Sequence, residues 1–302
     1  MKMKLLTLLL LLGFTSPTGS EVVQSFRSKC PQFFIGHLPS AKHEVTTPTV
    51  LKGKKYKQIC QRWEGQYRYA TLYDTKSRIP VYSAYTFYLK DHVKRNNDWK
   101  VEPQLDLPLK PENSNMISES DMNASVTSKF KNQALVKDYR QDNSGNITKG
   151  HLFPRSYAAD QDQADSTFTL TNIAPQTEKS NGLWRTEVET PMGNKIQQYC
   201  KPNETNPAYI VTGVVPGETW LPIKRENRAI DQGVNIPSHF WTAFTCTDKN
   251  RKISQAYIAQ QIYRKDNRQT RFQKQRMTVD ELEKKLTELY KQPFSVFRNT
   301  KI

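Results

Sequence analysis

One segment, residues 146–184, holds most of the side chains that can carry chemistry and limits how the chain around it can fold. His151 follows a lysine and a glycine, the run TFTLTN (residues 167–172) alternates as a strand does, and Asn181 stands at the start of a predicted helix. A histidine that faces asparagines between apolar strand residues indicates a metal-assisted hydrolytic site. The segment therefore predicts a strand and a helix that together support one site.

Strand patterns dominate the rest of the chain. Residues 67–89 predict a half-buried antiparallel hairpin that turns at residues 74–77, because tyrosines and valine alternate there with polar residues. Residues 208–215 (AYIVTGVV) predict a buried central strand, and further strands are predicted at residues 235–244 and 253–263.

Helix patterns are fewer. A helix is predicted over residues 181–196, although Pro191 and Gly193 limit its length. Another begins at Thr278, where a capping-box-like TVDE precedes leucines at helical spacing. Residues 127–139 are weakly helical.

The segment of residues 95–109 is polar, with two prolines and an isolated tryptophan, and predicts a long surface excursion. The chain shows no internal repeat and no clear domain boundary. These patterns predict one α+β domain over residues 21–302, with a mixed, mainly antiparallel central sheet and flanking helices.

Residues 1–20 have the form of a secretory signal peptide. Lys2 and Lys4 flank the start of an apolar run, and small and turn residues follow before Glu21. A signal anchor is the alternative, but the apolar run is shorter than the about 20 residues needed to span a bilayer. No later stretch is apolar enough to cross a membrane, so the mature product is expected to be secreted and extracellular, with no membrane-bound part.

The four cysteines fit an oxidising compartment. Their even number favours two disulfides, for which three pairings are possible, and sequence proximity favours Cys30–Cys60 and Cys200–Cys246. In zinc sites, paired ligands lie only a few residues apart in the sequence. These four cysteines are too far apart in the sequence to fit that pattern.

Three sequons, at Asn123, Asn146 and Asn203, predict N-glycosylation in the same compartment. A glycan on Asn146 would lie close to His151 in the sequence.

The formal net charge of +16 favours a polyanionic partner, such as nucleic acid, a heparin-like glycan or an anionic surface. The simpler alternative is a basic surface that only keeps the chain soluble. Charge alone indicates neither the chemistry nor the oligomeric state.

Several blocks, in order, resemble the DNA/RNA non-specific endonucleases of the His-Me finger (ββα-metal) class, and more narrowly the endonuclease domain-containing 1-like branch. The resemblance covers roughly residues 30–246. The blocks are RYATLYD (68–74), PVYSAY (80–85), KGHL (149–152), TFTLTNIAPQ (167–176), YIVTG (209–213) and NIPSHFW (235–241).

The resemblance implies a role for most of the candidate residues. His151 would be the general base. Lys149, directly before Gly150, is expected from its position alone to face a phosphate. Asn172 would lie beside the scissile phosphate, Gln176 would support the site, and Arg95 would be the transition-state arginine.

A divalent cation, Mg²⁺ by preference, is also implied by the resemblance. Asn181 would be its single protein ligand, and either Glu187 or Glu189 would hold metal-bound water. Mg²⁺ keeps several waters and binds phosphate oxygens, so one protein oxygen is enough to hold it in the presence of substrate.

The implied reaction is hydrolysis of phosphodiester bonds in DNA and RNA. Neutral imidazole, with an ordinary pKa near 6.5, accepts a proton from water at neutral pH. A metal and a cation stabilise the extra negative charge as water attacks phosphorus. Contacts limited to phosphate and sugar give little sequence preference, and the products would carry 5′-phosphate and 3′-hydroxyl ends.

The chain departs from the family pattern at two places. The usual Asp-Arg before Gly-His is Thr148-Lys149, which removes a carboxylate and a bidentate donor. The offset from Asn181 to Trp184 is one residue shorter than usual, and the two candidate glutamates straddle the expected position.

Plainer interpretations stand beside the catalytic one. A lone histidine is more often structural than catalytic, Asn172 can serve only in a turn, and Asn181 can be an ordinary helix N-cap. For the whole chain, the alternative is a catalytically impaired secreted protein of the nuclease fold that binds nucleic acid or other polyanions.

Overall fold

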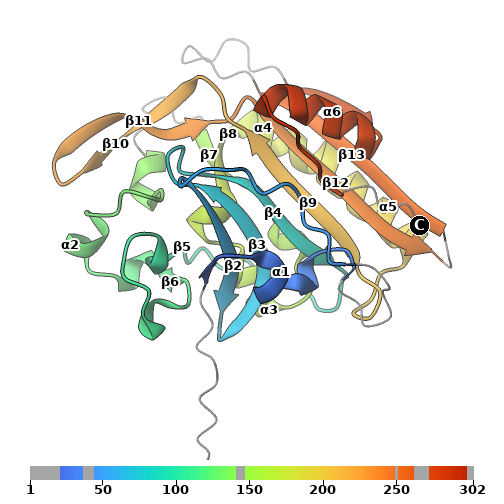
Figure 1. Ribbon diagram of the computed structural model, residues 1–302, viewed down its shortest axis with the longest axis horizontal. Coiled ribbons are helices and arrows are strands. Elements are labelled where there is room, and N and C mark those ends of the chain that lie inside the picture. The colour runs from blue at the N-terminus through green and yellow to red at the C-terminus, as the bar shows by residue number, and fades with distance from the viewer. Residues whose placement is uncertain (1–20, 37–43, 141–146, 249–250, 262–271, 298–302) are drawn as a thin grey trace, which may run out of the picture.

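The computed structural model describes residues 21–36, 44–140, 147–248, 251–261 and 272–297 (Figure 1). The expected signal peptide and the sequon at Asn146 lie outside these ranges. No helix in the described residues is long and apolar enough to cross a bilayer.

An eight-stranded sheet forms the centre of the molecule, in the order β1-β2-β3-β4-β9-β12-β13-β14, and every neighbouring pair is antiparallel (Figure 1). This arrangement confirms the predicted α+β class with a mainly antiparallel sheet. Its strands are β1 (Val22–Val23), β2 (Tyr56–Trp63), β3 (Gln66–Asp74), β4 (Ile79–Phe87), β9 (Ala208–Val215), β12 (His239–Asp248), β13 (Arg251–Gln261) and β14 (Phe272–Met277).

Besides the large sheet, the described residues form three two-stranded antiparallel sheets. They are β5 (Lys100–Val101) with β6 (Ile117–Ser118), β7 (Ile147–His151) with β8 (Ile173–Thr177), and β10 (Thr219–Arg225) with β11 (Arg228–Ile236). The pair β7–β8 carries His151 at its end.

The α-helices are short, apart from two. They are α1 (Phe26–Lys29), α2 (Ala124–Thr127), α3 (Gln161–Ser166), α4 (Glu178–Trp184), α5 (Thr190–Cys200) and α6 (Val279–Tyr290). A π-helical segment, Arg185–Glu189, joins α4 to α5, so the three form one continuous rod. The 3₁₀ turns are Pro31–Phe33, Pro103–Leu105, Pro111–Asn113, Glu119–Asp121, Val136–Arg140, Arg155–Tyr157 and Leu170–Asn172.

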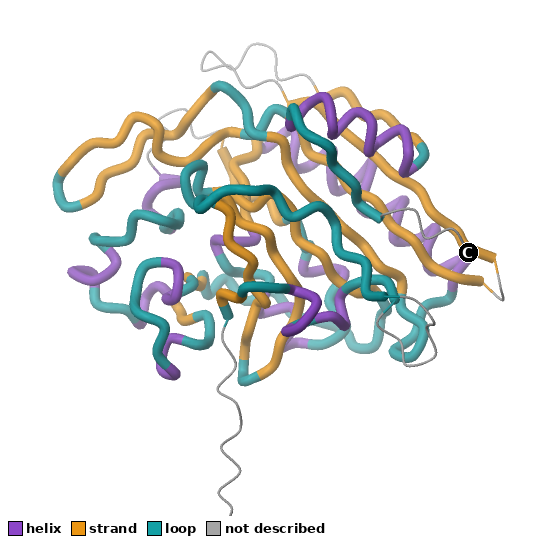
Figure 2. The backbone as a smooth tube through the Cα atoms, in the orientation of Figure 1, coloured by secondary structure: helices purple, strands orange, loops and turns teal. Residues whose placement is uncertain are grey.

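Alternate residues of each strand point to opposite faces of the large sheet. Apolar side chains occur on both faces, and other elements pack against each of them. On one face, Phe240 and Ile210 pack against Trp184 and Ile196 of the rod. On the other, Trp241 packs in the cluster that contains Leu282 and Leu286 of α6. Figures 1 and 2 show α6 on one side of the sheet and α4 and α5 on the other.

Several strand and helix predictions are confirmed. The hairpin forms as β3 and β4, the central strand as β9, and the later strands as β12 and β13. Thr278 caps α6 in a complete capping box with Glu281, which satisfies amide groups that a helix start leaves free.

The strand predicted at residues 167–172 is wrong. Residues 170–172 form a 3₁₀ turn, and the strand β8 begins at Ile173. The alternation misled because both the apolar and the polar side chains of this run are buried. Pro175 lies inside β8, and among the described residues β8 pairs with no strand other than β7, so Pro175 stands in an edge strand where the missing amide is tolerated.

The predicted helix from Asn181 exists and is longer than expected. It begins at Glu178, where the Thr177 side chain accepts a hydrogen bond from the Ser180 amide, and it runs to Cys200. Pro191 does not end it, because this proline lies in the first turn after the π segment, where the regular hydrogen-bond pattern is already interrupted.

The surface excursion predicted at residues 95–109 is wrong in its centre. Lys100 and Glu102 are fully buried, although both are charged. The Lys100 ammonium lies 3.1 Å from Asp98 Oδ2 and 4.5 Å above the Trp63 ring, and these contacts compensate its burial. Of the weak helix at residues 127–139, only the end of α2 and the turn at Val136–Arg140 form.

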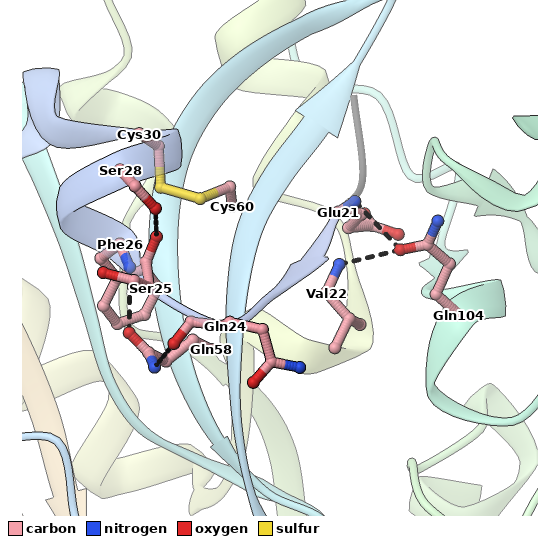
Figure 3. Close-up of a disulfide and its surroundings, with 10 residues drawn as sticks. All are labelled: Glu21, Val22, Gln24, Ser25, Phe26, Ser28, Cys30, Gln58, Cys60 and Gln104. Atoms are coloured by element: carbon pink, nitrogen blue, oxygen red, sulfur yellow. Dashed lines mark hydrogen bonds between the residues drawn. A yellow bond between two sulfur atoms is a disulfide. The ribbon is translucent and has the colours of Figure 1, made fainter. Parts of the chain in front are cut away.

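Both predicted disulfides are present, and the described residues contain no free cysteine. Cys30–Cys60 fastens the segment after α1 to β2, beside the bond from the Phe26 amide to Gln58 (Figure 3). Cys200–Cys246 fastens the end of α5 to β12 and so ties the rod to the sheet.

Candidate active site

A cavity of about 680 Å³ opens between β7, the start of the rod and the loop before β5. Four cationic side chains, two carboxylates and two aromatic rings contribute to its wall. The residues are Arg95, Asn97, Trp99, Ile147, Thr148, Lys149, His151, Pro154, Arg155, Ser156, Phe168, Glu178, Asn181, Gly182, Arg185 and Glu189. A positive cavity of this size suits a polyanionic ligand.

His151 lies at the end of β7, opposite Ile173 of β8. Its ring stands 4.9 Å from the Phe168 ring and 5.6 Å from the Trp99 ring, centroid to centroid. The Nε2 atom is shielded from solvent and has no hydrogen-bond partner among the described residues. The preceding Gly150 permits the close approach of β8, because a Cβ there would lie 2.3 Å from Gln176 Oε1.

Burial lowers the pKa of His151 to about 3, and the positive charges of Arg95, Arg155 and Lys149 act in the same direction. A hydrogen bond with the Lys149 backbone opposes the shift. Because Nε2 lacks a partner, Nδ1 makes this bond, which leaves Nε2 as the unprotonated nitrogen. The imidazole is therefore neutral at physiological pH and has an acceptor free for a proton.

Asn181 lies on α4 and faces the same cavity. Its Nδ2 donates to Thr148 Oγ1 at 3.0 Å, while Oδ1 receives no hydrogen bond from the described residues. Asn181 is not the N-cap of α4, since that position belongs to Thr177. The N-cap interpretation of Asn181 is therefore wrong.

The structure separates the two candidate glutamates. Glu189 lies on the cavity wall, whereas the carboxylate of Glu187 turns to Lys274 at 3.3 Å. Eight residues of a regular α-helix turn by about 800°, so Glu189 would lie about 80° away from the face of Asn181. The π segment turns less per residue and brings Glu189 back toward the cavity. Burial raises the pKa of Glu189 to about 7.

Asn172 is fully buried and does not line the cavity. Its Oδ1 accepts from Ser83 Oγ and the Phe153 amide, and its Nδ2 donates to the carbonyls of Phe153 and Thr167. All four hydrogen-bonding positions of the amide are thus used inside the protein. Asn172 braces the turn that carries Phe168, and this placement does not match the expected contact with phosphate.

Gln176 is also buried, and its Nε2 donates to Ser180 Oγ at 3.3 Å. It therefore supports the junction of β8 and α4 from inside and does not contact the cavity.

Arg95 and Lys149 both reach the cavity. The Arg95 guanidinium lies 5.8 Å from the Phe168 ring and donates to Asn97 Oδ1 at 2.8 Å. The Lys149 ammonium lies 4.9 Å from the Trp99 ring and 5.6 Å from the Tyr139 ring. Two aromatic faces thus hold this cation beside His151.

Two further cations in the cavity, Arg155 and Arg185, were missed from the sequence. Arg185 could have been found, because it follows Asn181 by four residues and so shares its helix face. Arg155 follows a proline in a turn and shows no periodic signal. The bond between Thr148 and Asn181 joins residues 33 positions apart, and no local sequence pattern indicates it.

Magnesium fits the oxygen atoms at this cavity. The described residues contain no group of three or more His, Cys, Asp or Glu side chains that could hold a metal ion. The cavity instead offers the unbonded Asn181 amide oxygen and the Glu189 carboxylate, which are the oxygen donors that Mg²⁺ accepts alongside water.

The chain is similar in sequence to a known protein family and to two of its members. The profile of the DNA/RNA non-specific endonuclease family matches residues 52–299. The endonuclease domain-containing 1 protein of Homo sapiens is 34% identical over 221 residues and that of Mus musculus is 31% identical over the same length, each over 72% of this chain. These matches span only 39% and 38% of the two relatives.

Among solved structures, a chain of the EndoG/EndoGI complex, described as revealing the mechanism of EndoG inhibition, aligns with a TM-score of 0.42 and 16% identity. The alignment covers 74% of this chain and 83% of that one. The family match extends over most of the sequence, including every residue at the cavity. The chain therefore belongs to the DNA/RNA non-specific endonuclease family.

Proposed function

We propose that this chain is a secreted, Mg²⁺-dependent endonuclease that hydrolyses phosphodiester bonds of DNA and RNA without sequence preference. The observation that carries the proposal is the neutral His151, which lines the cavity together with Asn181 and Glu189 and whose Nε2 has no hydrogen-bond partner among the described residues. Family membership supports the nuclease chemistry.

His151 supplies the base. Its Nε2 takes a proton from a water molecule as the water oxygen attacks phosphorus. The bond from phosphorus to the 3′ oxygen breaks, and that oxygen takes a proton from water. The products carry 5′-phosphate and 3′-hydroxyl ends. Phe168 and Trp99 hold the imidazole in place and keep it neutral by burying it.

Four cations bind the substrate. Arg95, Lys149, Arg155 and Arg185 surround the cavity, where their charge attracts phosphates and opposes the charge that develops during attack. Contacts of this kind are made with the backbone of the nucleic acid and carry little sequence information.

Asn181 Oδ1 would hold the divalent cation, and Glu189 would accept hydrogen bonds from its waters. When bound, the cation would polarise the phosphate and stabilise the leaving oxygen. Asn172 and Gln176 act as positioning residues in this proposal, since both are buried and turned away from the cavity.

The deciding experiment incubates purified protein with supercoiled plasmid, and separately with single-stranded RNA, in Mg²⁺ or in chelator. Metal-dependent fragmentation of both substrates is expected. Activity that persists in excess chelator, after metal has been stripped from the protein, would contradict the metal requirement.

The second candidate is a binder that does not cut. Lys149 favours it, because a lysine held between two rings replaces the arginine expected there and offers a point charge without a bidentate fork. The same experiment separates the candidates: an intact but retarded plasmid in Mg²⁺ would identify the binder.

Secretion rests on three features of the chain. These are the predicted signal peptide, the two disulfides, and the exposed sequons at Asn123 and Asn203. In each sequon, the asparagine Oδ1 accepts a hydrogen bond from the backbone amide of the hydroxyl residue two positions later, Ser125 or Thr205.

Expression in a mammalian cell line should release the protein into the medium, and glycosidase treatment should increase its mobility on a gel. Retention inside the cell would contradict this part of the proposal.

A further inference from the structure

The hydroxyl of Thr148 makes two hydrogen bonds, one with Gln176 and one with Asn181. Thr148 Oγ1 donates to the Gln176 carbonyl at 2.9 Å and accepts from Asn181 Nδ2 at 3.0 Å. A threonine hydroxyl carries one hydrogen, and a carbonyl oxygen only accepts. The single hydrogen is therefore committed to Gln176, and Oγ1 can offer Asn181 only an acceptor.

This arrangement selects one orientation of the Asn181 amide. Nδ2 must face Thr148, which leaves Oδ1 on the other side of the amide group, where no described residue donates to it. A flipped amide would set Oδ1 against the lone pairs of Thr148 Oγ1, which is repulsive. The oxygen is thus directed away from Thr148 and remains free to bind a ligand in the cavity.

The frame around Thr148 is rigid. Thr148 lies in β7 and pairs with Gln176 of β8, so its backbone is held by the strand pair. Asn181 lies in the first turn of α4, which Thr177 caps through the Ser180 amide. Gln176 Nε2 also donates to Ser180 Oγ, so strand and helix are joined at several points. A site held in this way keeps its geometry without the ion.

We infer that Thr148 is a positioning residue that fixes the Asn181 amide for binding of a divalent cation. The inference rests on the proposed function, in which Asn181 is the protein ligand. Thr148 stands where the family pattern has an aspartate. A carboxylate there could accept from Asn181 but could not donate to the Gln176 carbonyl, whereas the threonine hydroxyl does both. The replacement therefore preserves the orientation of Asn181 without adding negative charge to the cavity.

The test measures Mn²⁺ binding to the mature, nucleic-acid-free protein from the electron paramagnetic resonance signal of free Mn²⁺. Thr148→Val keeps the shape of the side chain and removes the hydroxyl, and it is expected to weaken Mn²⁺ binding about 10- to 100-fold. Thr148→Ser retains the hydroxyl and should bind Mn²⁺ nearly as wild type does. Wild-type affinity in Thr148→Val would overturn the inference.

The same Thr148→Val substitution, made in an Asn181→Asp variant, distinguishes a positioning role of Thr148 from a general loss of site structure. A carboxylate has two equivalent oxygens, so Asn181→Asp has no amide orientation to set. Thr148→Val should then have little effect on Mn²⁺ affinity in the Asn181→Asp background, although it has a large effect beside Asn181. An equal loss in both backgrounds would show that the hydroxyl acts in some other way.

Asn181→Ala tests the proposed function in the same assay. If Asn181→Ala loses Mn²⁺ while Thr148→Val does not, the ligand assignment stands and the positioning role is wrong. If Asn181→Ala binds Mn²⁺ as tightly as wild type, the ligand assignment itself fails, and the positioning role fails with it.

Discussion

At the scale of single residues, the cavity holds two groups whose pKa values differ from those of the same groups in water. His151 is neutral because it is buried and faces cations, and burial raises the pKa of Glu189 to about 7. A histidine and a glutamate with displaced pKa values in one cavity are typical of catalytic sites. Structural ion-pair networks also displace pKa values, but Nε2 of His151 has no such partner among the described residues.

The first prediction concerns the titration of His151. The unfolded chain takes up a proton on this side chain near pH 6.5, whereas the folded protein does not until about pH 3. The contribution of His151 to stability is therefore fully present above pH 6.5 and is lost as the pH falls from 6.5 toward 3. In an NMR titration of the nucleic-acid-free protein, the His151 ring should remain neutral from pH 8 to pH 5. A midpoint near 6.5 would contradict this environment.

The second prediction distinguishes the two glutamates. Glu189→Gln removes the carboxylate at the cavity and should lower the rate of DNA cleavage about 10- to 100-fold. Glu187→Gln is the matched control, because Glu187 pairs with Lys274 at the surface and should leave the rate close to wild type. A larger loss in Glu187→Gln than in Glu189→Gln would reverse the assignment.

At the scale of elements, the site depends on the meeting of the β7–β8 pair with the rod of α4, the π segment and α5. β7 places His151, the first turns of the rod place Asn181, and the π segment places Glu189. The Tyr157 hydroxyl donates to the Glu189 carbonyl and holds the π segment from one side. Cys200–Cys246 fixes the far end of the rod to β12.

The third prediction concerns this disulfide, which closes a loop with a sequence separation of 46 residues. The double variant Cys200→Ala, Cys246→Ala should lose about 2–4 kcal/mol of unfolding free energy, since the unfolded chain regains the freedom that the cross-link removes. Urea unfolding measures this loss. An unchanged midpoint, or free thiols in the unreduced wild-type protein, would contradict a structural role.

Antiparallel strands and the capping box of α6 follow local patterns, and these were predictable. The run at residues 167–172 was not, because its polar side chains are satisfied inside the protein by distant groups, as Thr171 is by Glu102. The sequence does not distinguish Glu189 from Glu187, because a π segment leaves no clear mark in composition. The motif around Asn172 predicts a contact with phosphate, because a short motif identifies a position but not the hydrogen-bond partners of its side chain.

At the scale of the whole molecule, positive charge and fold act together. The chain carries a formal net charge of +16. Four of its cationic side chains, those of Arg95, Lys149, Arg155 and Arg185, line one cavity. Charge elsewhere on the surface raises the local concentration of a polyanion, and in the proposed function the cavity is the place where the polyanion is cut. The basic composition therefore affects binding more than chemistry.

The fourth prediction follows from this charge. Binding of duplex DNA, measured in chelator to prevent cleavage, should weaken steeply and linearly on a plot of log affinity against log salt. Arg185→Ala should weaken binding for all sequences alike and reduce the slope by about 1, because one phosphate contact is lost. Lys201→Ala, at the far end of α5, is the control and should leave the slope unchanged. Equal effects of both variants would place the bound nucleic acid away from the cavity.

The central claim is that His151 acts as the base in a metal-dependent hydrolysis. The most direct measurement is the initial rate of plasmid cleavage in Mg²⁺ by His151→Ala, compared with wild type and with His239→Ala, whose histidine lies on β12 outside the cavity. His151→Ala should reduce the rate by about 10²- to 10⁴-fold while DNA binding is retained, and His239→Ala should cleave as wild type does. Undiminished Mg²⁺-dependent cleavage by purified His151→Ala would contradict the account.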